Sequence, residues 1–293
     1  MAKLMLFCNK SEHILPRFFR LVSQQQMKMT KYSTETLFTD SQQAECYAKF
    51  RPQYTDKVFQ RIINYCKTGS SYFDLAVDVG CGSGQSTVPL AKYFRKVIGV
   101  DVSEQQISNT PTNVPNVTFK VSSAEDLHFA KPASVDLVTI AQAFHWVHQD
   151  KFFTDVSRVL KTGGSLVVYG YGICELLPKE ADNVFQHYYA DVLGKYWPEG
   201  RQMVEEKYAT ASLPYPGWIR DDSLVIEKRC SVADFIGYMG SWSALIQYNN
   251  TKPGDNLLKE AEQRLQVVCR TGGDESQLTV VWPVFMLMGQ KPK

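Results

Sequence analysis

Three glycines alternate with other residues in one short segment, and this segment constrains the fold more than any other part of the chain. Residues 78–84 read Asp-Val-Gly-Cys-Gly-Ser-Gly. An apolar, β-branched run, residues 75–79, ends inside the segment, and residues 86–93 have the pattern of a starting helix. Glycines let the backbone bend sharply and let a ligand approach where a Cβ would intrude, and the unpaired N–H groups of the new helix can receive its polar atoms. The segment predicts a strand-to-helix turn suited to a nucleoside cofactor.

Spacing separates this turn from two better-known phosphate-binding loops. A P-loop is excluded because no Gly-Lys-Ser or Gly-Lys-Thr follows. The dinucleotide fingerprint needs its third glycine at position 85, which is Gln85, whereas Gly84 comes one residue early. This departure argues against NAD and FAD, and a turn without any ligand remains the alternative.

An acidic residue follows the second predicted strand at the distance that nucleoside binding needs. Residues 96–100 predict this strand, and it ends in Asp101, 21 residues after Gly80. A carboxylate at this place can accept hydrogen bonds from both hydroxyls of a ribose. By itself Asp101 could equally be an exposed turn residue or the N-cap of the next helix. The glycine segment upstream favours ribose binding.

Two further strands are predicted at residues 117–121 and 135–141. The sequence Ser-Ser-Ala-Glu-Asp-Leu follows the first of them, and Gln-Ala-Phe-His-Trp, residues 142–146, follows the second. Ligands of open α/β sheets bind beyond the carboxyl ends of the strands. We therefore expect His145 and Trp146 to face the reaction site.

Five motifs in this order resemble the type 11 domain of class I S-adenosylmethionine-dependent methyltransferases, and within it the trans-aconitate methyltransferase-like group. Residues 47–54, Tyr-Ala-Lys-Phe-Arg-Pro-Gln-Tyr, are similar to that group's entry segment. Thr55 and Thr162 stand where the usual pattern has proline. The resemblance is dense over residues 40–172 and thin afterwards. The five motifs occupy residues 78–84, 99–103, 124–127, 141–146 and 158–164.

The resemblance implies a fold, a cofactor and a set of binding residues. The fold is α/β and Rossmann-like, with a seven-stranded, mostly parallel sheet, an antiparallel last strand inserted between strands five and six, and a helical lid insertion. The cofactor is S-adenosyl-L-methionine, and the loop after the third strand lies along its adenine, with Glu125 or Asp126 beside the exocyclic amine; a solvated acidic turn is the alternative. The candidate cofactor-binding residues are Asp78, Gly80, Cys81, Gly82, Gly84, Asp101, Val102, Ala124, Glu125 and Gln142.

The resemblance further implies a small carboxylic acid as the methyl acceptor. A carboxylate is ionised at pH 7 and needs no general base, so His145 either orients the acid or has a structural role. Arg51, on a helix that would end at Pro52, or a neighbouring donor is expected to hold the anion; the alternative for Arg51 is a surface arginine paired with Asp56 or Glu45. Phenols, thiols and amines stay open as acceptors, as does an inactive cofactor-binding scaffold. The residues expected to shape the acceptor pocket are Tyr47, His145, Trp146 and Trp242.

The remaining sequence predicts one enzyme domain, residues 32–293, with a cofactor-binding core at about 70–172 and lid or substrate elements at about 40–66 and 175–250. Strands are expected at 224–229 and 278–289, and helices after Ser231 and at 255–270. Residues 1–31 are basic and are expected to form a disordered extension, with a mitochondrial presequence as the alternative.

Composition excludes several other classes of protein. The formal net charge of +2 with 21% charged residues provides no basic field for a nucleic-acid partner. The seven cysteines are odd in number and scattered without a Cys-x-x-Cys pair, so we expect reduced thiols in a cytoplasmic protein, no disulfide framework and no metal site. No apolar run reaches the roughly 18 residues of a membrane span. The expected oligomeric state is a monomer or a weak homodimer.

Overall fold

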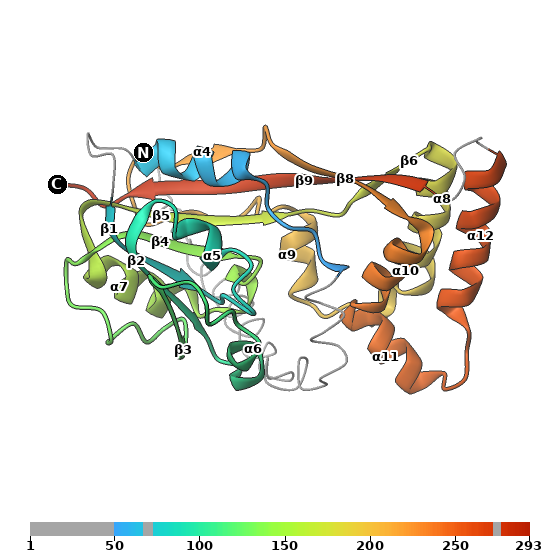
Figure 1. Ribbon diagram of the computed structural model, residues 1–293, viewed down its shortest axis with the longest axis horizontal. Helices are drawn as coiled ribbons and strands as arrows, with labels where there is room; N and C mark the ends of the chain where they lie inside the picture. The colour runs from blue at the N-terminus through green and yellow to red at the C-terminus, as the bar shows by residue number, and fades with distance from the viewer. Residues whose placement is uncertain (1–49, 67–72, 272–276) are drawn as a thin grey trace, which may run out of the picture.

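The computed structural model describes residues 50–66, 73–271 and 277–293, so the predicted basic extension lies outside the described residues (Figure 1). Helices and strands alternate in the first half of the chain, and helices dominate most of the second. In chain order the elements are α4 (Asp56–Cys66), β1 (Phe73–Val79), α5 (Thr87–Leu90), β2 (Phe94–Asp101), α6 (Glu104–Ser108), β3 (Val117–Val121), β4 (Val135–Ala141), η2 (Phe144–Trp146), α7 (Gln149–Val159), β5 (Leu160–Tyr171), β6 (Glu175–Leu177), α8 (Lys179–Gln186), η3 (His187–Val192), η4 (Gly194–Tyr196), α9 (Arg201–Glu205), β7 (Ile219–Asp221), β8 (Val225–Ser231), α10 (Val232–Gly240), α11 (Ser243–Thr251), α12 (Leu257–Thr271) and β9 (Gln277–Gln290).

The first five strands form a parallel sheet in the order β3-β2-β1-β4-β5. The register places Val79 of β1 opposite Val100 of β2 and Ile140 of β4. Because the strands are parallel, their carboxyl ends meet at one edge of the sheet. The predicted Rossmann-like α/β fold is confirmed.

Alternate residues of these strands build two apolar cores, one on each face of the sheet. Ala76 of β1 packs in the core that includes buried residues of α4, whereas Val77 and Val79 pack in the core that includes α7. The strands are buried on both faces, which explains their nearly continuous apolar composition. The sheet is therefore a rigid layer between helices and can hold loops at its carboxyl edge in fixed positions.

The last strand, β9, is antiparallel to β5, as predicted, but it does more than close a seven-stranded sheet. It is 14 residues long and also pairs with β6, β7 and β8, which gives nine strands in total. The short strands β6 and β7 were not predicted. The strand β6 pairs with the part of β9 that extends past β5, whereas β7 pairs with the same residues of β9 as β5 does, 286–288 (Figure 1).

A group of helices surrounds the amino-terminal half of β9, at the opposite end of this strand from β1–β3 (Figure 1). Helix α12 packs on α8 and α10, and these two pack on β6 and β8. The predicted start of α10 is confirmed, since the Ser231 hydroxyl accepts a hydrogen bond of 3.1 Å from the Asp234 N–H. Five aromatic rings from this region stack edge to face or tilted on one another: Phe185, Tyr189, Trp197, Tyr238 and Trp242.

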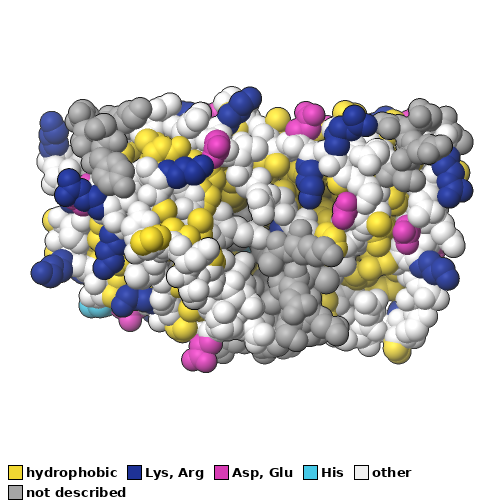
Figure 2. Space-filling model, in the orientation of Figure 1, with side chains coloured by type: hydrophobic (Ala, Val, Ile, Leu, Met, Phe, Trp, Pro, Cys, Tyr) yellow, Lys and Arg dark blue, Asp and Glu magenta, His cyan; other side chains and the backbone are white. Residues whose placement is uncertain are grey.

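No described helix is both long and apolar enough to cross a membrane. Positive and negative side chains are interspersed on the surface (Figure 2). Figure 2 shows Lys and Arg side chains spread across one face with Asp and Glu side chains between them. The cysteines within the described ranges are buried, and they are Cys66, Cys81, Cys174, Cys230 and Cys269.

Candidate active site

The glycine loop after β1 adopts backbone conformations that side chains disfavour. Gly80 and Gly84 have φ angles of +63° and +88°. A Cβ on Gly80 would lie 2.5 Å from the Cβ of Ala143, and one on Gly84 would lie 2.7 Å from the ring of Phe119. Only glycine allows the loop to pack this closely against Ala143 and Phe119. Gly82 lies between them, also with positive φ, and Cys81 is buried.

Asp78, the acid that opens the motif, is fully buried beneath a set of hydroxyl groups. Its carboxylate accepts hydrogen bonds of 2.7 Å from Ser86, Thr87 and Thr139. Burial raises the pKa of Asp78, and the three hydroxyl groups oppose that rise. The carboxylate thus fastens the glycine loop to the helix that follows it and to β4. Direct contact between Asp78 and a cofactor stays a prediction.

Asp101, at the end of β2, connects the two loops that a nucleoside would contact. One carboxylate oxygen accepts a hydrogen bond of 2.9 Å from the Gly82 N–H, and the other accepts one of 2.9 Å from the Ser103 N–H. Each oxygen has a further lone pair, so the carboxylate can still accept the two hydroxyls of a ribose. Val102 follows and is 43% exposed, which leaves an apolar surface beside the carboxylate.

The loop after β3 is tied to the segment after β4. The Glu125 carboxylate accepts a hydrogen bond of 2.7 Å from the His148 N–H and another from the Ser123 hydroxyl. The half-buried Ala124 precedes it. The two loops expected to surround adenine are therefore joined through Glu125, whose contact with the base stays a prediction.

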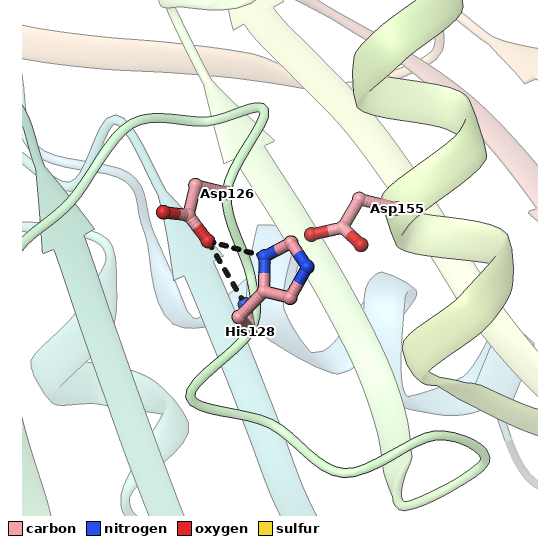
Figure 3. Close-up of side chains that lie close together, drawn as sticks. All are labelled: Asp126, His128 and Asp155. Atoms are coloured by element: carbon pink, nitrogen blue, oxygen red, sulfur yellow. Dashed lines mark hydrogen bonds and ion pairs between the residues drawn. The ribbon is translucent and has the colours of Figure 1, made fainter.

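Asp126, His128 and Asp155 lie close together, with one ligand atom of each within 4.8 Å of the others (Figure 3). The His128 Nδ1 is 2.6 Å from the Asp126 carboxylate. The Asp155 carboxylate accepts hydrogen bonds from the Leu127 N–H and, at 2.6 Å, from the Arg158 guanidinium. The positive charge of this guanidinium would repel a metal cation at Asp155. The hydrogen bond from Leu127 to Asp155 instead attaches the loop after β3 to α7. Sequence spacing showed no such group because Asp155 joins it only through the fold.

Gln142 directly follows the carboxyl end of β4 and has a strained backbone conformation. Its φ is +55°, a conformation that costs a residue other than glycine about 1 kcal/mol or more. Its N–H donates to the Tyr169 carbonyl at 3.0 Å, and its side-chain amide donates to the Tyr171 carbonyl at 2.9 Å. These two bonds hold the loop of His145 and Trp146 against the end of β5.

His145 is buried and contacts a tyrosine that sequence reasoning did not identify. Its Nδ1 is 2.8 Å from the hydroxyl of Tyr208, and its ring centroid is 4.7 Å from that of Trp146. Burial, assisted by the positive charge of Arg201, lowers the pKa of His145 to about 3. The imidazole is therefore neutral at physiological pH and is a weak base. Trp146 is half-buried.

Arg51 lies in a bend that follows the helical Phe50, so the prediction of a helix reaching Pro52 was wrong. Its guanidinium donates to the Ser241 carbonyl at 3.1 Å and lies 5.5 Å from the centroid of the Tyr238 ring. Asp56, one acid considered as its partner, pairs with Lys92 at 3.2 Å.

Of the other residues expected to shape the acceptor pocket, the structure describes Trp242 but not Tyr47. Trp242 is 2% exposed and packs inside the aromatic cluster, so it supports a pocket wall from behind. Tyr47 and Glu45 lie outside the described residues.

Arg201, on α9, is a second arginine near these aromatic rings. Its Nε donates to the Tyr189 hydroxyl at 3.0 Å, and its guanidinium lies 4.8 Å from the centroid of a ring of Trp197 and 3.6 Å from the Glu205 carboxylate. These four residues line a cavity of about 400 Å³. Its segment shows only helical periodicity and aromatic residues, so nothing in the sequence singled out this arginine.

The residues at the carboxyl edge fit a nucleoside cofactor. At Gly82 a built Cβ would meet no protein atom nearer than 3.8 Å, Asp101 has lone pairs left for a ribose, and Val102 provides apolar surface for a base. A methyltransferase domain model matches residues 77–168, which contain all three of these features.

Comparisons with known proteins extend the match to most of the chain. A Dictyostelium discoideum protein named "Putative methyltransferase" is 34% identical over 250 residues, 85% of this chain and 93% of that protein. A Saccharomyces cerevisiae protein named "Probable S-adenosylmethionine-dependent methyltransferase" is 31% identical over 176 residues, 57% of this chain and 60% of that protein. The solved structure of a "Putative Type II Methyltransferase" from Anaeromyxobacter dehalogenans has a TM-score of 0.73 and 34% identity, and covers 83% of this chain and 99% of its own. The chain belongs to the class I methyltransferases, enzymes that use S-adenosyl-L-methionine as cofactor.

Proposed function

We propose that this enzyme methylates a carboxylate oxygen of a small organic acid. The observation that carries the proposal is the presence of two arginines, Arg51 and Arg201, beside the aromatic cluster. Burial is the main cause of the raised pKa of Tyr238, and both guanidinium charges are near enough to this ring to oppose that rise. With the Glu205 carboxylate 3.6 Å from Arg201, the two arginines leave one net positive charge next to aromatic walls, which suits a small anion with an apolar or unsaturated body.

The proposed division of labour follows from the chemistry of the acceptor. The cofactor supplies a methyl group on a sulfonium sulfur. The acid is already ionised at pH 7 and needs no base, which agrees with the neutral imidazole of His145. Arg51 and Arg201 orient the anion, while the glycine loop and Asp101 fix the cofactor. Correct positioning of two reactants can contribute ~7–11 kcal/mol.

The surroundings of the site favour the same reaction. Opposite charges cancel as the methyl group moves, so a site of low dielectric constant lowers the barrier. Buried aromatic rings around the two arginines reduce contact with water. Binding elements are therefore more important here than acid or base groups.

The test uses labelled cofactor and a panel of small mono-, di- and tricarboxylic acids. Arg51→Met should raise KM for a methylated acid by about tenfold or more, because a charge-assisted hydrogen bond is lost, and should leave cofactor affinity nearly unchanged. Arg95→Met is the control, since this exposed arginine pairs only loosely with Asp74, at 3.7 Å. The product should release methanol in alkali. A base-stable product, or equal rates with acids and their amides, would overturn the carboxylate acceptor.

A further inference from the structure

The short helix α9 touches His145 at both of its ends. Gly200 precedes the helix, and a Cβ built on it would lie 3.5 Å from the imidazole Cδ2 and 3.7 Å from the His145 carbonyl oxygen. Tyr208 follows the helix, and its hydroxyl is 2.8 Å from the imidazole Nδ1. His145 therefore lies close to Gly200 before the helix and contacts Tyr208 after it, more than 50 residues further along the chain.

Tyr208 fixes the carboxyl end of this helix firmly. Its side chain is fully buried, and its ring packs edge-on against Phe144 at 5.5 Å and Phe285 at 5.0 Å between centroids. Its φ is +54°, and that of Lys207 is +52°. Two successive residues other than glycine adopt this conformation only where the surroundings impose it.

The backbone at this end of α9 is also hydrogen-bonded. The Tyr208 N–H donates to the Met203 carbonyl at 2.8 Å, and the Lys207 carbonyl accepts from the Arg220 guanidinium at 2.8 Å. A change in the position of Tyr208 would therefore move α9 with it. Arg201, the first residue of α9, would move too.

We propose that His145 is a positioning residue: through its contacts with Gly200 and Tyr208 it holds α9 where Arg201 meets the anion of the acceptor. The inference rests on the proposed acceptor site. In this role His145 positions α9, whereas in a general-base mechanism it would take a proton from the acceptor. A base would act on the acceptor itself, whereas the role proposed here depends on the contact between Nδ1 and the Tyr208 hydroxyl.

The experiment compares the full chain with Tyr208→Phe, His145→Ala, His145→Asn and the double variant His145→Ala with Tyr208→Phe. Tyr208→Phe and His145→Ala should each raise KM for the best acid of the panel by about fivefold, the change expected for one lost hydrogen bond, with kcat nearly unchanged. The double variant should add little, because both single changes remove the same contact. His145→Asn should stay close to the wild type, since its side chain can still bond to the Tyr208 hydroxyl.

A second readout does not depend on the acceptor. Hydrogen exchange of the Glu206, Lys207 and Tyr208 amides, which bond to α9 carbonyls, should become several-fold faster in Tyr208→Phe and His145→Ala but not in His145→Asn. Tyr215→Phe is the matched control, because Tyr215 is also buried in this core and bonds to a side chain outside α9, the Ser157 hydroxyl. Exchange in the glycine loop should not change.

The outcomes separate this inference from the proposed function. Unchanged exchange in Tyr208→Phe, or exchange in His145→Asn as fast as in His145→Ala, would overturn the positioning role of His145 whatever the acceptor is. If the exchange results are as expected and Arg201→Met leaves KM unchanged, the anion site fails and the support of α9 by His145 stands.

Discussion

Acidification should weaken this protein through His145 in a way that can be calculated. Burial, with Arg201 as the second cause, lowers the pKa of this imidazole from 6.5 to about 3. In the unfolded chain the same group takes up a proton near pH 6.5. Between these two pH values the unfolded state therefore binds one proton more than the folded state. The stabilising contribution is complete above pH 6.5 and is lost as the pH falls towards 3.

The size of the effect follows from the difference between the two pKa values. Each pH unit in this window corresponds to about 1.4 kcal/mol, so the free energy of unfolding should fall by about 2 kcal/mol between pH 6.5 and pH 5. The side chain is only 8% exposed, so solvent screening does not reduce this figure greatly.

Urea unfolding, followed by far-ultraviolet circular dichroism between pH 7.5 and pH 5, measures this loss. His145→Asn is the reference, because it cannot titrate and keeps a hydrogen-bonding group beside Tyr208. The wild type should lose about 2 kcal/mol more than the variant over this range. Carboxylates titrate in both proteins, so their effect cancels in the difference. Parallel pH dependences would refute the buried, neutral state of His145.

Three further predictions concern the cofactor site, a turn and the amino-terminal segment. Asp101→Ala should lower affinity for S-adenosyl-L-methionine at least tenfold, because two charge-assisted hydrogen bonds are lost, and unchanged affinity by calorimetry in a folded variant would contradict ribose binding. Ala133→Gly should stabilise the fold by roughly 0.5–1 kcal/mol, since Ala133 is exposed with a φ of +51°; a lower melting temperature would oppose this reasoning. Removal of residues 1–30 should leave cofactor binding intact, and its loss would show that this segment packs on the enzyme.

Sequence reasoning succeeded where a feature depends on neighbouring residues. The predicted third and fourth strands have the observed bounds, because their apolar runs are short and clearly delimited. The glycine loop adopts the sharp turn that its three glycines predict. The helix after it is shorter than predicted: residues 86–93 have helical periodicity, yet α5 ends at Leu90, just before β2 begins.

The sequence by itself determined the fold class, the cofactor loop and the acid at the end of β2, because backbone geometry and periodicity act within a few residues. Only the tertiary structure decided which distant side chains meet. The contact between His145 and Tyr208 joins residues 63 positions apart, and Arg201 reaches the aromatic cluster through the placement of α9. The position of Tyr208 is set by packing against η2 and β9, and no local pattern encodes it. The glycine loop and the acid after β2 could therefore be predicted from motifs, whereas the proposed acceptor site depends on how the second half of the chain packs against the first.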